Sequence, residues 1–288
     1  MCLQAYKGIL IFGASGQLGR ALTRGLGGLG PVHTLRHSDC DVGDSTALRA
    51  AVDKFTPGIL INASAYTAVD KAEDERAAAF HINAVAPGLM ADVALASGAW
   101  LIHYSTDYVF DGCKGRPYTE TDATGALNVY GESKRMGEQA VLARPIVGFV
   151  LRTSWLYDRD GHNFLTTVAR LATAGPLRIV ADQYGTPTSV DALAKATRAL
   201  ILHPNAQDKG GLYHATCLGE TSWHGFAEAI LAMQGIPTPV TAISTKDYPA
   251  KAVRPAYSVL DSSKLKATFG ITLPPWQEAL RVVLAKAV

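Results

Sequence analysis

The sequence has few cysteines, and they form no pattern. Its four cysteines, Cys2, Cys40, Cys113 and Cys217, are scattered and include no C-x-x-C pair. This scatter predicts neither a zinc site nor a redox dithiol, and the eight histidines show no metal-ligand spacing, so no metal is predicted. A chain of 288 residues that is 48% hydrophobic can build a core without disulfides. We therefore expect reduced structural thiols, as in a cytoplasmic protein.

The sequence also lacks an excess of one charge and a long apolar run. It has 27 Lys+Arg against 25 Asp+Glu, which excludes the broad basic face that a nucleic-acid partner needs. No stretch of about 20 apolar residues runs without a charge, a turn or a polar break, so no membrane span is expected. Residues 1–7 lack the basic segment and cleavage site of a signal peptide. High hydrophobicity with low net charge excludes disorder for most of the chain.

The first half of the chain alternates short apolar runs with amphipathic stretches. Such runs, separated by helices, predict a doubly wound parallel α/β sheet of the Rossmann type, covered on both faces. After about Trp155 the pattern loosens, and 247–255 is expected to be irregular because prolines interrupt it. Strands are predicted at 9–12, 32–35, 59–61, 100–104 and 147–151, and helices at 17–26, 45–55, 80–97 (with Pro87 as a kink point), 164–174 and 190–202.

A glycine-rich segment, 13–19 (GASGQLG), directly follows the first strand and opens the first helix. Glycines at this place allow a tight turn and let the backbone approach a diphosphate, which the helix N-terminus attracts. The alternative is a tight strand–helix turn without a ligand. The segment lies between a strand and a helix, as the dinucleotide fingerprint requires. The resulting candidates for cofactor binding are Gly13, Ser15, Gly16, Gln17 and Leu18.

The second strand is followed by Arg36, where an acidic residue would bind the ribose 2′-hydroxyl of NADH. An arginine there can pair with a 2′-phosphate, which favours NADPH, with NADH as the second choice. An exposed loop arginine without a ligand is the alternative. Further cofactor candidates follow the second and third strands: Asp41 and Val42 against the adenine, and Ala63, Ser64, Ala65 and Tyr66 across the strand ends.

Three residues further along predict a catalytic set. Thr106 follows the fourth strand, and Tyr130 and Lys134 form a Y-x-x-x-K pair, which a helix places one turn apart on one face. The pKa of a tyrosine is about 10, and a neighbouring ammonium together with the positive nicotinamide ring of an oxidised cofactor is expected to lower it. Tyr130 could then exchange a proton near pH 7, while Thr106 polarises a substrate oxygen. Y-x-x-x-K alone is typical of any amphipathic helix, but its place after a glycine loop and a threonine is specific.

This arrangement resembles the extended short-chain dehydrogenases/reductases, which use a Ser/Thr–Tyr–Lys set with NAD(P). Longer segments are similar to the dTDP-4-dehydrorhamnose reductase family among them, and the similarity covers most of the chain. These segments are 67–73 (TAVDKAE), 104–112 (YSTDYVFDG), 128–134 (NVYGESK), 152–157 (RTSWLY), 163–164 (NF) and 182–188 (DQYGTPT).

The resemblance implies NADPH-dependent reduction of the 4-keto group of dTDP-4-dehydro-L-rhamnose to give dTDP-L-rhamnose. Tyr130 would donate a proton, Thr106 would hold the sugar oxygen, and Lys134 would bind the nicotinamide ribose. Each implied substrate contact has a plainer structural alternative, such as core packing for a tryptophan or a helix N-cap for an asparagine. The implied substrate-binding residues are Asp107, Trp155, Asn163, Gln183 and Arg254.

The resemblance also divides the chain. Residues 1–155 and 190–218 are predicted to form the dinucleotide-binding domain, and 156–189 and 219–288 a smaller, less regular α/β substrate domain. Some members of the family hold a metal at a dimer contact through glutamates, one of them just after the glycine loop. Residues 19–22 here are GRAL, without a carboxylate, so we expect no metal there and leave a homodimer open.

Two other functions compete with this interpretation. One is a related nucleotide-sugar reductase or epimerase, because epimerases of the superfamily share the tyrosine–lysine chemistry. The other is a non-catalytic regulatory subunit that resembles the one of methionine adenosyltransferase. The joint presence of Thr106, Tyr130 and Lys134 favours an enzyme, because a binding module does not need all three.

Overall fold

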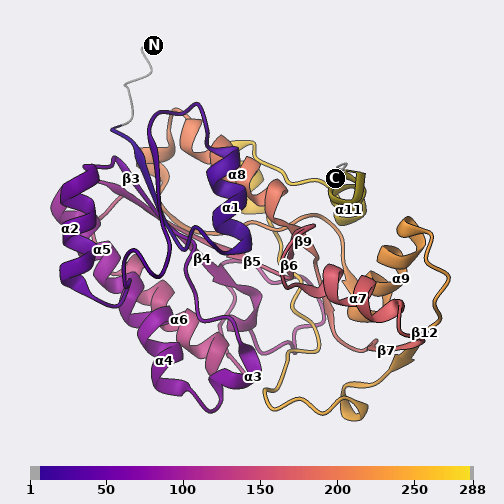
Figure 1. Cartoon of the computed structure of the whole chain (residues 1–288). Coiled ribbons are helices and arrows are strands. Elements are labelled where there is room, and N and C mark those ends of the chain that lie inside the picture. Colours follow the sequence, from indigo (N-terminus) through magenta and orange to yellow (C-terminus); the bar gives the residue numbers. More distant parts are fainter. Residues whose placement is uncertain (1–6, 286–288) are drawn as a thin grey trace.

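A six-stranded parallel sheet forms the centre of the computed structural model, which describes residues 7–285 (Figure 1). The strand order is β10-β5-β4-β3-β1-β2, and every pair is parallel. The predicted doubly wound α/β class is therefore confirmed. The strands are β1 (Ile9–Phe12), β2 (Val32–Leu35), β3 (Ile59–Asn62), β4 (Trp100–Thr106), β5 (Gly148–Thr153) and β10 (Gly211–His214).

Alternating residues of the central strands enter two different apolar cores. In β1, Ile9 and Ile11 belong to one core, whereas Leu10 and Phe12 belong to the other, and all four are at most 1% exposed. A strand that buries both faces must be apolar at every position, which is why these runs are continuous in the sequence. On one face lie α1 (Gln17–Gly25) and α8 (Val190–Leu202), and on the other α2 (Ser45–Phe55), α5 (Ala86–Ser97) and α6 (Val129–Leu142).

The helix expected at 80–97 is longer and of mixed type. It runs from Arg76 to Ser97 as α4 (Arg76–Phe80), the π-helical turn η1 (His81–Val85) and α5. The irregularity therefore lies in the turn before Pro87, which occupies the first turn of α5. By length and composition alone this helix could cross a membrane, but 56% of its most apolar window is buried inside the protein. Packing against the sheet and α6 accounts for its apolar composition.

The segments after β5, apart from α8 and β10, form a second lobe beside the carboxyl ends of the large sheet, drawn from red through orange to yellow in Figure 1. Its strands pair only two by two, which agrees with the looser pattern of the sequence. The pairs are β6 (Leu156–Tyr157) with β9 (Thr188–Ser189), β7 (Leu177–Val180) with β12 (Val240–Ile243), and β8 (Tyr184–Gly185) with β11 (Thr221–Ser222). Its helices are α7 (Phe164–Ala172), α9 (Trp223–Gln234), α10 (Ser263–Phe269) and α11 (Trp276–Ala285).

Short helical turns complete the fold: α3 (Val69–Ala72), η2 (Asp107–Val109), η3 (Ala206–Lys209) and η4 (Thr245–Asp247). Residues 248–255 form no helix and no strand, as expected. The predicted domain boundaries remain a prediction, because one apolar core contains Ile9 of the sheet together with Tyr157 and Phe226 of the second lobe.

The cysteines of residues 7–285 form neither a disulfide nor part of a metal site. Cys40, Cys113 and Cys217 are free, and no group of three or more His, Cys, Asp or Glu side chains is placed to hold a metal within that range. Cys2, and residues 1–6 on which the signal-peptide expectation rests, lie outside the described residues.

Candidate active site

A groove opens at the carboxyl ends of β1, β3 and β4. It consists of a main cavity of about 500 Å³ and a side cavity of about 310 Å³, which share Gly16, Ala63, Ser64 and Ala65. The strand order reverses between β1 and β3, and ligands of open α/β sheets bind at such a reversal. Every cofactor candidate except Asp41 lines one of the two cavities: Gly13, Ser15, Gly16, Gln17, Leu18, Arg36, Val42, Ala63, Ser64, Ala65, Tyr66, Tyr130 and Lys134.

The glycine loop brings the start of α1 to the groove. A Cβ at Gly19 would lie 2.2 Å from the carbonyl oxygen of Gly13, so only glycine lets the first helical turn fold back on the loop. The α1 N-terminus has no side-chain cap and no acidic residue in its first turn. Its N–H groups and the positive end of its dipole therefore remain available to an anion. These features fit the diphosphate of a dinucleotide.

The side cavity ends at the segment after β2. Arg36 and Val42 line it, and the exposed Arg36 side chain is free to approach a 2′-phosphate. Its backbone N–H donates to Asp39, which shapes the turn. The Asp41 carboxylate instead accepts a hydrogen bond from the backbone of Gly43 at 2.9 Å and does not line either cavity. The predicted contact of Asp41 with adenine thus has no support from its position.

The three predicted catalytic residues line the main cavity together. Asn128 caps α6 by accepting from the backbone of Gly131 at 2.8 Å, which fixes the turn that carries Tyr130. Gly131 packs against η2: a Cβ there would lie 2.1 Å from the carbonyl oxygen of Tyr108. This close approach brings the Tyr130 hydroxyl and the Thr106 side chain to the same part of the cavity.

Burial sets the pKa of Tyr130. It raises that pKa to about 12, against the opposing effect of the Thr106 side chain. The Lys134 ammonium donates to the carbonyl oxygen of Tyr104 at 2.6 Å. The expected lowering of the Tyr130 pKa by this ammonium together with an oxidised nicotinamide stays a prediction. A high pKa keeps the proton on Tyr130 at pH 7, which is the form that a proton donor needs.

Lys134 is held one helical turn from a buried ion pair. Burial lowers the pKa of Lys134 to about 8, and the Glu138 carboxylate opposes this shift. Both carboxylate oxygens of Glu138 accept from Arg152 of β5, at 2.8 and 2.7 Å. A buried bidentate ion pair holds its two side chains in one relative orientation, and this one fixes α6 against the sheet.

Asp107 lies directly beside the catalytic set in the main cavity. Its carboxylate accepts from the Thr106 hydroxyl at 3.0 Å and from the Ser258 hydroxyl at 2.5 Å. Burial raises the pKa of Asp107 to about 7, although both hydrogen bonds favour the ionised form. A carboxyl group that titrates near neutral pH therefore sits next to the predicted proton donor.

Trp155 enters the main cavity from the loop after β5. Its ring stacks on Trp223 with centroids 3.4 Å apart and an interplanar angle of 5°. The backbone of Trp155 has a φ of +46°, a strained conformation for a bulky residue. Packing on the second lobe holds this conformation and turns the indole toward the groove, so Trp155 combines packing with a position suited to a ligand.

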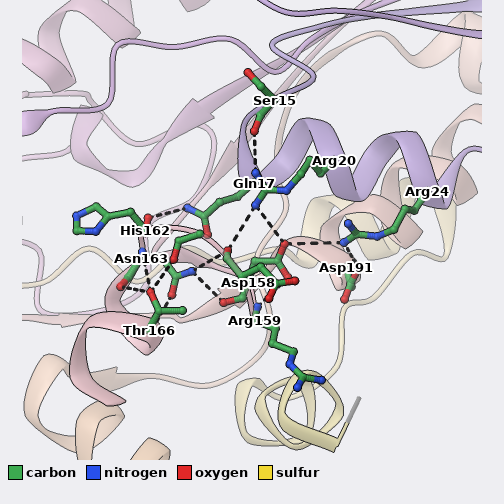
Figure 2. A network of polar contacts seen from close by, with 12 residues as sticks. Ser15, Gln17, Arg20, Arg24, Asp158, Arg159, His162, Asn163, Thr166 and Asp191 are labelled. Carbon is green, nitrogen blue, oxygen red and sulfur yellow. Dashed lines mark hydrogen bonds and ion pairs between the residues drawn. The ribbon is translucent and has the colours of Figure 1, made fainter. Parts of the chain in front are cut away.

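The other three substrate candidates lie outside both cavities. Asn163 is the N-cap of α7, and its side-chain amide donates to the carbonyl of Asp158 at 2.9 Å (Figure 2). Gln183 is buried and donates to Thr245 at 3.0 Å. Arg254 is paired with Asp70 at 2.6 Å. In each case the polar group has a partner within the protein, and a substrate role stays a prediction.

Two polar residues near the groove have no counterpart in the sequence analysis. Asn83, in η1, exchanges hydrogen bonds with the backbone of Tyr66 and donates to Ser133 of α6, so it fixes the loop after β3 against α6, the helix that carries Tyr130 and Lys134 and is called the catalytic helix below. The signal that could have found Asn83 in the sequence is an asparagine within an otherwise apolar helical stretch. Arg20 lines the main cavity beside the glycine loop, and its guanidinium donates to the Ser15 carbonyl at 2.7 Å.

Comparison with known proteins agrees with this geometry. The family model of the RmlD substrate binding domain matches residues 7–288. The dTDP-4-dehydrorhamnose reductase of Burkholderia thailandensis is 43% identical over 286 residues, covering 94% of this chain and 96% of its own. The chain belongs to the dTDP-4-dehydrorhamnose reductase family. Family membership also confirms the resemblance inferred from the segments quoted above.

Two further members support the assignment over nearly the whole length. The dTDP-4-dehydrorhamnose reductase of Escherichia coli is 40% identical, with 96% of each chain covered. The crystal structure of the dTDP-4-dehydrorhamnose reductase of Bacillus anthracis in complex with NADP has a TM-score of 0.93 and 34% identity, covering 97% of this chain and 99% of that chain. The similarity therefore extends over nearly the whole of these relatives, and the fold is shared.

Proposed function

We propose that the protein is an NADPH-dependent reductase that converts the 4-keto group of dTDP-4-dehydro-L-rhamnose into the alcohol of dTDP-L-rhamnose. One observation carries the proposal. Thr106, Tyr130 and Lys134 line the same cavity as the uncapped start of α1, so a proton donor and an anion site open into one groove. Membership in the reductase family supports this choice of sugar nucleotide.

Each catalytic residue has a distinct task in the proposal. The bound nicotinamide supplies the hydride. Tyr130, protonated because its pKa is about 12, donates its proton to the sugar oxygen. Thr106 donates a hydrogen bond to that oxygen as negative charge develops on it. Lys134 is cationic at pH 7, since its pKa is about 8, and offers its ammonium to the ribose hydroxyls.

The test is consumption of NADPH in the presence of the 4-keto-sugar nucleotide. Wild type should oxidise NADPH, and Tyr130→Phe should lower turnover by about 10²–10⁴-fold while cofactor affinity changes little. Tyr213→Phe is the matched control, because the Tyr213 hydroxyl donates to the Lys209 carbonyl and does not line the cavity. Unchanged turnover in Tyr130→Phe would remove Tyr130 from its role.

The same assay separates the competing functions. An epimerase would isomerise a sugar nucleotide without net loss of NADPH. A regulatory subunit would bind NADPH and leave every sugar nucleotide unchanged. Either result with the wild-type protein would overturn the proposal.

Preference for NADPH over NADH is also part of the proposal, and it is supported by Arg36 at the side cavity and by the NADP complex of a related reductase. We further propose a cytoplasmic location, which fits the free buried thiols of Cys40 and Cys217. A homodimer stays a prediction.

A further inference from the structure

Arg20 lies between the glycine loop and a segment of the second lobe. We call residues 158–162, between β6 and Asn163, the strap. Figure 2 shows the Arg20 side chain reaching from α1 toward the strap. One guanidinium nitrogen donates to the carbonyl of Ser15 at 2.7 Å, and the other donates to the carbonyl of Asp160 at 3.4 Å. The guanidinium is thus placed by two main-chain carbonyls from opposite sides of the groove.

These two hydrogen bonds leave further N–H groups of the Arg20 guanidinium able to bind a ligand. An arginine has five N–H donors, and the two carbonyl bonds occupy only part of them. The nearest carboxylate, Asp158, is 3.9 Å from Arg20 and lies 3.8 Å from Arg24 as well. Arg24 has a second carboxylate in Asp191, at 3.4 Å. Asp158 therefore sets the direction of the Arg20 side chain without forming a close ion pair with it.

The position of Arg20 matches the expected charge of a ligand. Arg20 lines the main cavity together with Gly16 and Gln17 of the glycine loop and Gly161 and His162 of the strap. The Arg20 side chain is 37% exposed, so its charge is accessible from the groove. Arg24 is one helical turn further on and does not line the cavity. The wall beside the uncapped helix start thus carries a fixed positive charge.

We propose that Arg20 binds the diphosphate of the dinucleotide, on the side of the groove that the strap forms. This inference rests on the proposed function, because it takes the ligand of the groove to be a dinucleotide. The diphosphate is common to NADPH and NADH. Arg20 therefore increases affinity for both, whereas Arg36 distinguishes between them.

The experiment measures dissociation constants of four ligands: NADPH, NADH, ADP-ribose and adenosine 2′-monophosphate. The first three contain the diphosphate, and the last contains only the 2′-phosphate end. Arg20→Ala should weaken binding of the first three by a similar factor of about 10–100, as expected for loss of a charge-assisted hydrogen bond. Binding of adenosine 2′-monophosphate should stay unchanged.

Two further variants make the result specific. Arg20→Gln keeps an N–H donor group on a shorter side chain but removes the charge, so it should weaken the same three ligands. Arg24→Ala removes a cation of the same helix outside the cavity and should leave all four dissociation constants unchanged. Circular dichroism and the urea midpoint establish that each variant is folded.

Three outcomes would overturn the inference: diphosphate ligands that bind Arg20→Ala as tightly as wild type, equal weakening in Arg24→Ala, or weakened binding of adenosine 2′-monophosphate in Arg20→Ala. Failure of the proposed function looks different. In that case the wild-type protein itself would not bind NADPH, or would bind it without reducing the 4-keto-sugar nucleotide.

Discussion

A single methyl group on Gly131 should displace the proposed proton donor. In Gly131→Ala the new Cβ would lie 2.1 Å from the carbonyl oxygen of Tyr108 and 2.9 Å from its carbonyl carbon. Carbon and oxygen atoms in contact are about 3.3–3.6 Å apart, so α6 and η2 must separate by about 1 Å. Tyr130 precedes Gly131 on α6, and Thr106 precedes η2. The separation therefore changes the position of the Tyr130 hydroxyl relative to Thr106.

Two effects set the expected size of the change. Alanine is favoured over glycine inside a helix by about 1 kcal/mol. Forcing a methyl group into a packed interface costs about 1–3 kcal/mol. The free energy of unfolding should consequently fall by no more than about 2 kcal/mol. A displacement of about 1 Å at a catalytic group lowers the rate by about 10²-fold, so activity should suffer far more than stability.

The assay combines NADPH oxidation with urea denaturation of the same preparations. The control is Gly27→Ala, where a Cβ would lie 3.5 Å from the nearest neighbouring atom, an ordinary contact. Turnover should fall in Gly131→Ala and stay at the wild-type rate in Gly27→Ala. A fully active Gly131→Ala enzyme would refute the reasoning that this close approach positions Tyr130.

Two other substitutions probe the ends of the groove. Arg36→Ala should weaken NADPH binding about tenfold or more and leave NADH binding unchanged, as titration calorimetry can measure; an unaltered preference would mean that Arg36 does not contact the 2′-phosphate. Asp107→Asn tests the buried carboxyl through pH. The pKa of Asp107 is about 7 in the folded protein and near 3.8 when unfolded, so the folded state binds more protons between these values. Wild-type stability should therefore fall as pH rises from about 4 to 7, by up to about 4 kcal/mol from this group, and Asp107→Asn should lack that part of the fall in urea titrations.

Apolar runs predicted every strand of the large sheet except β10, because its central strands are buried on both faces. β1 is a continuous apolar run, and β4 begins with one, as a covered parallel sheet requires. The second lobe was harder to predict. Strands such as β6 and β9 have two residues each and form only by pairing with each other. Because the two strands are distant in the sequence, no local pattern marks them.

The sequence predicted those parts of the groove that are lined by local motifs, in which the functional residues lie close together in the sequence. The glycine loop and the Y-x-x-x-K pair are local motifs, and the fold brings both to one cavity. Arg254 shows where this reasoning stops. Its partner Asp70 is 184 positions away, and sequence spacing cannot tell whether an arginine faces a ligand or an aspartate of its own chain. Arg20 was missed for the same reason, since its carbonyl partner Asp160 comes from the second lobe.

The π-helical turn η1 changes the direction in which the apolar face of the helix from Arg76 to Ser97 points. Because hydrogen bonds in a π turn span one residue more than in an α-helix, the apolar stripe after η1 is rotated about the axis relative to the stripe before it. Before the turn, Ala79 packs with Val129 of the catalytic helix, and after it Met90 packs into the core beneath the sheet. Deleting one residue from η1 would realign the two stripes. The helix could then keep its packing before η1 or its packing after η1, but not both.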